Sequence, residues 1–380
     1  MIKRYYDIQM VRRLIDLFPV TALLGARQCG KTTLAKAIEA DAYFDLENPR
    51  DLVMLDNPQM TLERLSGLVV IDEVQRKPEL FALLRYLVDT HPETRYLILG
   101  SASRELICQS SESLAGRIGH YYLGGLRLTD VGAENMLRLW VQGALPRAYV
   151  LDAEPSRLWT ANYVTTLLER DFPQLGIRIA SDTLRRFWMM LAHYHGQVLN
   201  LTELGRNFGI SAHTVKRYIH LLVGTFMVRL VQPWATNIGK RIVKNPKLYI
   251  RDSGVLHHFL SVESFDDMLA HPRLGAMWEG FALETIARTL GKGDDEIFFY
   301  RTHTGIEADL FWQSQGKSWA VEFKYADAPA LTKSMTTCLT DLSLEHLWVV
   351  YPGNKRYKLH EKITVLPLTD VGNEWEYEIH

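Results

Sequence analysis

The sequence predicts an α/β fold, because short apolar runs of strand type alternate with helical patterns along the first third of the chain. The apolar run at residues 20–24 breaks into a turn bounded by Gly25 and Gly30, and a helical pattern at residues 34–38 follows it. A second run, residues 68–71, is followed by two acidic residues. The 380 residues exceed what one core usually holds, so we expect two or three domains.

Composition indicates a globular protein, with 47% apolar and 23% charged residues. The formal charge of -1 excludes a uniformly basic nucleic-acid coat, so any nucleic-acid contact must come from a local patch. Cys29, Cys108 and Cys338 lack metal-ligand spacing, which fits a reducing compartment. There is no apolar run of spanning length and no apolar signal core, so we expect a cytoplasmic protein, with peripheral membrane attachment left open.

The turn after the first apolar run has the GxxxxGK[ST] pattern of a phosphate-binding loop. Glycines let backbone N–H groups close around a phosphate, Lys31 would reach the β- and γ-oxygens, and the Thr32 hydroxyl would take a place on Mg²⁺. A glycine-rich turn that binds nothing is the alternative, which the flanking strand and helix patterns disfavour. The predicted ATP-binding residues are Gly25, Ala26, Arg27, Gln28, Cys29, Gly30, Lys31, Thr32 and Thr33.

Two carboxylates, Asp72 and Glu73, follow the apolar run at residues 68–71. A buried parallel strand is apolar on both faces, so acids at its carboxyl end point into the crevice where the phosphate-binding loop also lies. Asp72 would hold Mg²⁺, directly or through water, and Glu73 would act as general base on the attacking water. The alternative is a helix cap that follows a strand.

Two further candidates follow later strands. Ser101 comes after the strand pattern at residues 95–99 and could sense the γ-phosphate, although serine after a strand is usually turn chemistry. Arg117 precedes the next strand pattern and could neutralise charge on a γ-phosphate, in its own subunit or in a neighbour. A surface arginine explains residue 117 equally well.

Taken together, residues 25–32, 68–73, 97–101 and 113–117 resemble the predicted AAA+ ATPases of bacteria and archaea. More narrowly, they resemble the group whose C-terminal domain is related to PD-(D/E)XK nucleases. The resemblance implies a parallel sheet of strand order 5-1-4-3-2 and favours Arg117 as an arginine finger or sensor. Ser101 stands where many members carry Asn or Thr. We expect an AAA+ core at residues 1–150, a helical connector with a winged helix-turn-helix at 151–260, and a nuclease-like domain at 261–380.

A helix-turn-helix pattern occupies residues 201–223, with Ser211 as the expected cap of its second helix. Residues 225–231 and 247–250 look like strands that flank a basic loop, which would form a wing. Residues 199–251 contain nine Lys and Arg against one acid, as expected of a segment that binds a phosphate backbone. A protein-contact or purely structural winged helix is the alternative. The predicted nucleic-acid contacts are Lys216, Arg217, Lys240, Arg241 and Lys244.

The last third carries a D…ExK constellation. In the strand pattern at residues 319–324, period-two alternation places Glu322 and Lys324 on one face, close to Asp309 on the hairpin partner. Two such carboxylates can bind Mg²⁺, and the lysine can steady charge on a phosphate. The set resembles the PD-(D/E)XK nuclease core, in which Glu279 matches the helix glutamate, although Ala308 replaces the proline. An ordinary charged strand with a salt bridge is the alternative.

These observations predict an ATPase that uses ATP and Mg²⁺ and acts on DNA, with a possible Mg²⁺-dependent nuclease at the carboxyl end. The catalytic candidates are Lys31, Glu73, Ser101, Arg117 and Lys324, and the metal ligands would be Thr32, Asp72, Glu279, Asp309 and Glu322. The rival hypothesis is a nucleotide-dependent switch or adaptor whose last domain is an inactive protein-binding module. Either hypothesis is compatible with a homo-oligomer or with a protein partner.

Overall fold

The computed structural model describes residues 2–101, 114–235 and 242–371. The chain forms two compact units. Unit 1 contains the residues up to Leu126 together with residues 145–147 and 224–226, and unit 2 contains residues 127–144, 148–223 and those from Met227 onward. These units do not follow the boundaries expected at residues 150 and 260, and the three-part division remains a prediction.

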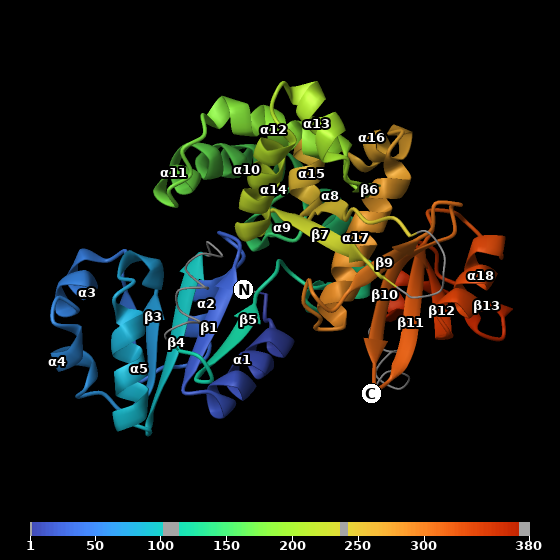
Figure 1. Cartoon of the computed structure of the whole chain (residues 1–380). Helices are drawn as coiled ribbons and strands as arrows, with labels where there is room; N and C mark the ends of the chain where they lie inside the picture. Colours follow the sequence, from blue (N-terminus) through green and yellow to red (C-terminus); the bar gives the residue numbers. More distant parts are fainter. Residues whose placement is uncertain (1, 102–113, 236–241, 372–380) are drawn as a thin grey trace. The chain divides into compact units, whose positions relative to one another are not determined.

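Unit 1 is built on a five-stranded sheet in which all neighbouring strands are parallel. Its order is β2-β3-β4-β1-β5, so the predicted order 5-1-4-3-2 is confirmed, as is the α/β fold class. Figure 1 shows this sheet in blue to teal. The strands are β1 (Val20–Gly25), β2 (Ala42–Asp45), β3 (Gly67–Asp72), β4 (Thr94–Ser101) and β5 (Ile118–Tyr122).

Both faces of this sheet are buried, which explains why its strands are apolar without alternation. Leu23, Val70 and Leu97 pack with α1 and α2 on one face, whereas Ala22 and Ile71 pack with α4 and α5 on the other. The helices of this unit are α1 (Tyr5–Leu17), α2 (Lys31–Lys36), α3 (Pro49–Met54), α4 (Pro58–Leu62) and α5 (Leu80–Thr90), with a 3₁₀ turn at Val74–Arg76.

Unit 2 begins with helices. The predicted helix-turn-helix corresponds to α13 and α14, which are joined through Gly209 in the left-handed conformation. Ser211 caps the second helix as expected, since its Oγ accepts a hydrogen bond from the Thr214 N–H at 3.1 Å. The helices are α7 (Leu128–Val131), α8 (Met136–Gln142), α9 (Pro146–Val150), α10 (Ala153–Thr166), α11 (Phe172–Gln174), α12 (Ser181–His193), α13 (Leu201–Phe208), α14 (Ala212–Gly224), α15 (Ser253–Leu260), α16 (Phe265–Ala270), α17 (Leu274–Thr289) and α18 (Lys333–Asp341), with a π-helical turn at Leu167–Asp171 and 3₁₀ turns at Ala133–Asn135 and Leu368–Asp370.

A mixed nine-stranded sheet joins the helix-turn-helix segment to the carboxyl-terminal part of unit 2. The strands expected to flank the wing pair with each other, and the first of them also pairs in parallel with β9. This continuity places side chains of the middle segment next to those of the last third. The order is β13-β14-β12-β11-β10-β9-β7-β8-β6, from β6 (Gln197–Val198), β7 (Val228–Pro233), β8 (Lys247–Ile250), β9 (Phe298–Arg301), β10 (Glu307–Ser314), β11 (Lys317–Phe323), β12 (Leu344–Tyr351), β13 (Tyr357–His360) and β14 (Ile363–Pro367).

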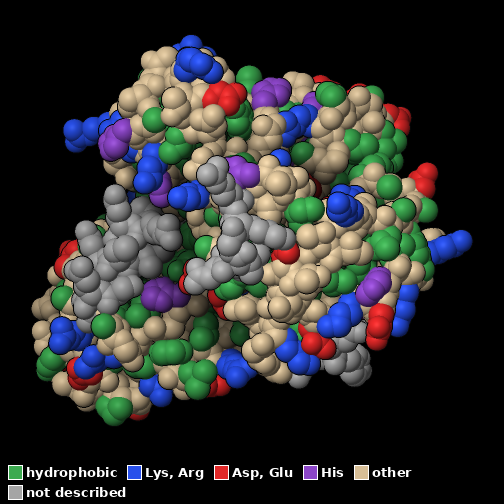
Figure 2. Space-filling model, turned by 45° about the vertical axis from the view of Figure 1, so that its right-hand side comes forward, with side chains coloured by type: hydrophobic (Ala, Val, Ile, Leu, Met, Phe, Trp, Pro, Cys, Tyr) green, Lys and Arg blue, Asp and Glu red, His purple; other side chains and the backbone are tan. Residues whose placement is uncertain are grey.

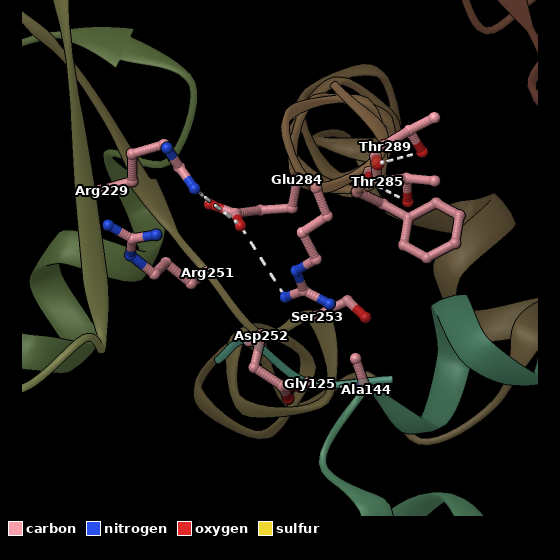
Figure 3. Close-up of polar contacts among 12 residues, drawn as sticks. Gly125, Ala144, Arg229, Arg251, Asp252, Ser253, Glu284, Thr285 and Thr289 are labelled. Atoms are coloured by element: carbon pink, nitrogen blue, oxygen red, sulfur yellow. Dashed lines mark hydrogen bonds and ion pairs between the residues drawn. The ribbon is translucent and has the colours of Figure 1, made fainter. Parts of the chain in front are cut away.

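A buried ion cluster ties β7 to α17 inside unit 2. The Arg229 guanidinium donates to both carboxylate oxygens of Glu284, at 2.5 and 3.2 Å, and also to Asp294. Figure 3 shows the Glu284 side chain reaching from its helix toward Arg229. Both residues are only 4% exposed, so these buried charges depend on the ion pairs of the cluster for compensation. Within the part of the chain that the structure describes, no helix has the length and apolar character needed to cross a membrane.

Candidate functional site

The phosphate-binding loop lies at the carboxyl edge of the unit 1 sheet, between β1 and α2. Gly25 is required there because a Cβ would lie 2.3 Å from the carbonyl oxygen of Leu123, and Gly30 adopts a φ of 101° that other residues rarely adopt. The buried Lys31 ammonium donates to the carbonyl oxygens of Gly25 and Ala26, both at 3.0 Å. Lys31 is therefore held against the same loop that would bind the phosphates, which its ammonium would contact.

Thr32 and Asp72 meet at this edge although 40 residues separate them in the chain. The Thr32 hydroxyl donates to Asp72 Oδ2 at 2.8 Å, and the Tyr43 hydroxyl donates to the same oxygen at 2.7 Å. Burial and this carboxylate raise the pKa of Tyr43, so its hydroxyl stays protonated. Adjacent oxygen ligands of an octahedral Mg²⁺ are about 3 Å apart, given Mg–O distances of about 2.1 Å. The spacing of Thr32 and Asp72 fits such an ion.

Glu73 follows β3 in a left-handed conformation, with φ 56°. This turn directs the chain into the Val74–Arg76 segment, and the Glu73 carboxylate accepts a hydrogen bond from the Gln75 side-chain amide. The Glu73 N–H donates to Asp72 Oδ1 at 2.9 Å. The partly buried Glu73 carboxylate thus has a fixed orienting partner, as a general base requires. Sequence reasoning assigned neither Gln75 nor Tyr43 to the site.

Arg4 braces the phosphate-binding loop from the amino-terminal segment, and sequence reasoning missed it. Its guanidinium donates to the carbonyl oxygen of Cys29 at 2.8 Å and to that of Gly125 at 2.9 Å. It also pairs with Asp7 at 2.8 Å, and both side chains are buried. A single arginine before an amphipathic helix carries no distinctive pattern, so only the folded chain reveals this role.

We expect Arg4→Met to raise the Kd for ATP about tenfold, because hydrogen bonds from a charged group to the loop carbonyls contribute about 1.5–3 kcal/mol each. Titration with a fluorescent ATP analogue measures the effect. The double variant Arg4→Met/Asp7→Asn is the matched control, because it removes the carboxylate that would otherwise lose its guanidinium. It should regain thermal stability without regaining affinity. An unchanged Kd in Arg4→Met would rule out a positioning role.

Arg117 lies at the opposite edge of the sheet. The Val20 N–H at the start of β1 donates to the Arg117 carbonyl oxygen at 3.1 Å, whereas the phosphate-binding loop follows the end of that strand. The guanidinium pairs with Asp89 at 2.7 and 2.9 Å. A role for Arg117 in its own pocket does not fit this placement; a role in a neighbouring subunit stays a proposal.

The backbone of Ser101 pairs with Gly25 at the carboxyl edge.

The predicted metal ligands of the last third surround a lysine from the middle segment. Lys247 Nζ lies 2.9 Å from Glu279 Oε1, 2.9 Å from Asp309 Oδ1 and 2.6 Å from Glu307 Oε1. Lys324 pairs with Glu322 Oε1 at 2.6 Å. Among the described residues, no three His, Cys, Asp or Glu side chains are arranged to hold a metal ion. The structure therefore brings the predicted residues together, but around an ammonium group.

Basic side chains compensate the charge of this carboxylate cluster, and burial favours its protonated forms. Burial together with Asp309 raises the pKa of Glu279 to about 7 and that of Glu322 to about 8. Arg301 pairs with Glu307 at 3.5 Å, so three cations face four carboxylates. The raised pKa values mean that the protonated forms of Glu279 and Glu322 are favoured, as expected where carboxylates share a buried site.

The basic segment is less exposed than its composition suggests. Arg229, Lys247 and Arg251 are directed inward to acids of unit 2, and all three take part in ion pairs. Lys216, Arg217 and Lys244 are exposed, whereas Lys240 and Arg241 lie outside the described residues. On the face seen in Figure 2, Lys and Arg side chains are scattered among acidic and uncharged ones. The predicted local excess of positive charge is therefore partly neutralised by folding.

Comparison with known proteins is consistent with this geometry. Residues 17–131 match the family described as an AAA domain, while residues 133–266 and 274–371 match two domains of unknown function, DUF8612 and DUF4143. The chain is 43% identical over 379 residues to the uncharacterized proteins Rv2008c of Mycobacterium tuberculosis and Mb2031c of Mycobacterium bovis, which covers 98% of this chain and 85% of each relative. It belongs to their family.

The match to the AAA domain supports an ATPase-like domain at residues 17–131, the part of the chain that contains the phosphate-binding loop and Asp72. Among solved structures, the chain is similar to the Walker-type ATPase PABY2304 of Pyrococcus abyssi, with 16% identity and a TM-score of 0.49 over 68% of this chain and 96% of that one. It is also similar to the Hsp104–ADP complex of S. cerevisiae, with 11% identity and a TM-score of 0.31 over 78% of this chain and 44% of that one.

Proposed function

We propose that this chain is a nucleotide-dependent switch that binds ATP with Mg²⁺ in unit 1 and hydrolyses it. The observation that carries the proposal is the meeting of Lys31, Thr32 and Asp72 at one sheet edge, with Thr32 and Asp72 at the spacing of two magnesium ligands. The loop supplies backbone N–H groups for the phosphates. The 43% identity to the mycobacterial relatives adds no substrate, because their names state none.

Each residue has a distinct part in the proposed reaction. The Lys31 ammonium leaves the carbonyls of Gly25 and Ala26 to contact the β- and γ-phosphate oxygens. Thr32 and Asp72 would hold Mg²⁺, which supplies charge neutralisation on those oxygens. Glu73, oriented by Gln75, accepts a proton from the water that attacks the γ-phosphorus in line. Phosphate release that requires both Mg²⁺ and Lys31 is the test, measured as ATP turnover by the purified chain.

A contact with DNA through α14 is a second proposed function, favoured by its exposed basic residues. Lys216 and Arg217 lie one after the other on the exposed side of this helix, while Val215 and Ile219 are buried. Arg206 on α13 and Lys244 before β8 are exposed as well. Among the described residues, we therefore expect these four cations to provide the electrostatic attraction to DNA, rather than all nine Lys and Arg counted in the sequence.

The salt dependence of DNA binding tests this contact. Each lost phosphate contact should reduce the slope of log K against log salt by about 0.9. The double variant Lys216→Ala/Arg217→Ala should therefore flatten the slope by about 2, as measured by fluorescence anisotropy with a duplex of arbitrary sequence. Lys317→Ala, which changes an exposed lysine on β11, is the matched control. If the slope of the double variant equals that of the wild type, these residues do not contact DNA.

A further inference from the structure

Lys247 is buried at the centre of a constellation that joins three elements far apart in the chain. It comes from β8, and its partners are Glu279 on α17 and Glu307 and Asp309 on β10. The side chain is 3% exposed and its three ion-pair distances lie between 2.6 and 2.9 Å. An ammonium group with carboxylate oxygens on three sides has the surroundings that a small cation requires in a protein.

Several carboxylate oxygens of this cluster are already engaged by hydrogen bonds. Asp309 Oδ1 accepts from Lys247, and Oδ2 accepts from the backbone N–H of Phe323 at 3.0 Å. Glu279 Oε1 accepts from Lys247 and from the Tyr249 hydroxyl. Among the described residues, one fully buried carboxylate oxygen of the predicted ligand set has no hydrogen-bond partner, and this is Glu322 Oε2. Because Glu279, Glu307 and Asp309 each direct an oxygen to the Lys247 ammonium, a Mg²⁺ or Mn²⁺ ion that needs several oxygen ligands would have to displace the lysine.

We propose that the Lys247 ammonium is a built-in cation, which takes the place of a divalent metal among Glu279, Glu307 and Asp309. The residues that look like a nuclease centre in the sequence therefore form a metal-free ionic core in unit 2. The lysine also links the strand pair β7–β8 to the last third of the chain, because its partners belong to α17 and β10. This inference goes beyond the ATPase function and does not depend on it.

Removal of the lysine should create a metal site. In Lys247→Met, which keeps an apolar side chain of similar length, three carboxylates remain without their central cation. We expect the nucleotide-free full-length variant to bind one more Mn²⁺ per chain than the wild type. The Kd of this additional site should be at least tenfold lower than the Kd of any Mn²⁺ site in the wild type. Electron paramagnetic resonance of free Mn²⁺ measures this. Lys247→Met/Asp309→Asn should lose the gain, and Lys244→Ala, at an exposed lysine three positions earlier, should not show it.

The wild type provides an independent test, which holds even if Lys247→Met does not fold. We expect Asp309→Asn to leave Mn²⁺ binding by the nucleotide-free protein unchanged, and we expect no plasmid nicking with Mg²⁺ or Mn²⁺. Wild-type Mn²⁺ binding that disappears in Asp309→Asn would overturn the proposal. So would nicking that is lost in both Glu322→Ala and Lys324→Ala, or a folded Lys247→Met variant with no additional Mn²⁺.

Discussion

Lys31→Ala is expected to lower ATP turnover by at least about 10²-fold, because it removes a charged donor from the phosphates in the transition state. The side chain is buried against the loop carbonyls of Gly25 and Ala26, so its ammonium already lies against the loop that we propose binds the phosphates. Alanine leaves the backbone of the loop intact and α2 can still begin at this residue. Phosphate release under saturating Mg²⁺–ATP measures the loss.

Glu73→Gln is the matched variant, because it changes the proposed base without removing a phosphate contact. Turnover should fall by about 10²–10⁴-fold, the usual contribution of a general base, while the Kd for an ATP analogue stays within about threefold of the wild type. Lys31→Ala should weaken binding as well. Full turnover in Lys31→Ala, or an equal loss of affinity in both variants, would contradict the roles assigned to these residues.

Glu284→Gln is expected to destabilise unit 2 by about 3–5 kcal/mol, because it leaves the buried Arg229 without its principal carboxylate. All nine tryptophans lie at residue 140 or later, so tryptophan fluorescence during urea denaturation reports on unit 2. Glu296→Gln is the control: that carboxylate is half exposed and pairs with Lys292 on the surface, so its loss should cost less than about 1 kcal/mol. Equal midpoints for the two variants would show that the buried pair is not needed.

The same residue predicts a pH dependence. Burial alone would raise the pKa of Glu284, but the guanidinium groups of Arg229 and Arg251 lower it to about 2, from 4.5 in an unfolded chain. A carboxyl whose folded pKa is depressed contributes stability above its unfolded pKa and loses it as pH falls toward the folded value. The difference in unfolding free energy between wild type and Glu284→Gln should therefore shrink between about pH 4.5 and pH 2. A difference that stays constant over this range would argue against the charge pair.

The phosphate-binding loop followed from patterns confined to short stretches, whereas the order of the unit 1 sheet was expected from the resemblance to AAA+ ATPases. Buried parallel strands are apolar throughout and the turn after β1 has a fixed spacing of glycines, so the sequence around residues 20–32 contains its own structural information. The pairing of Thr32 with Asp72 then follows from parallel strands ending at one edge. By contrast, the residue type of Arg117 gave no indication that it faces the opposite edge.

The amino-acid sequence by itself determined the α/β class and the phosphate-binding loop, because each depends on local periodicity or on a motif of fixed spacing, whereas the strand order of unit 1 was expected from the family resemblance. Only the tertiary structure decided which charged side chains face solvent. Arg4, Arg229 and Lys247 look like surface cations in the sequence, yet each is buried against acids or carbonyls that are distant in the chain or come from another element. The partner of a buried charge is chosen by long-range packing, and no local pattern encodes that choice.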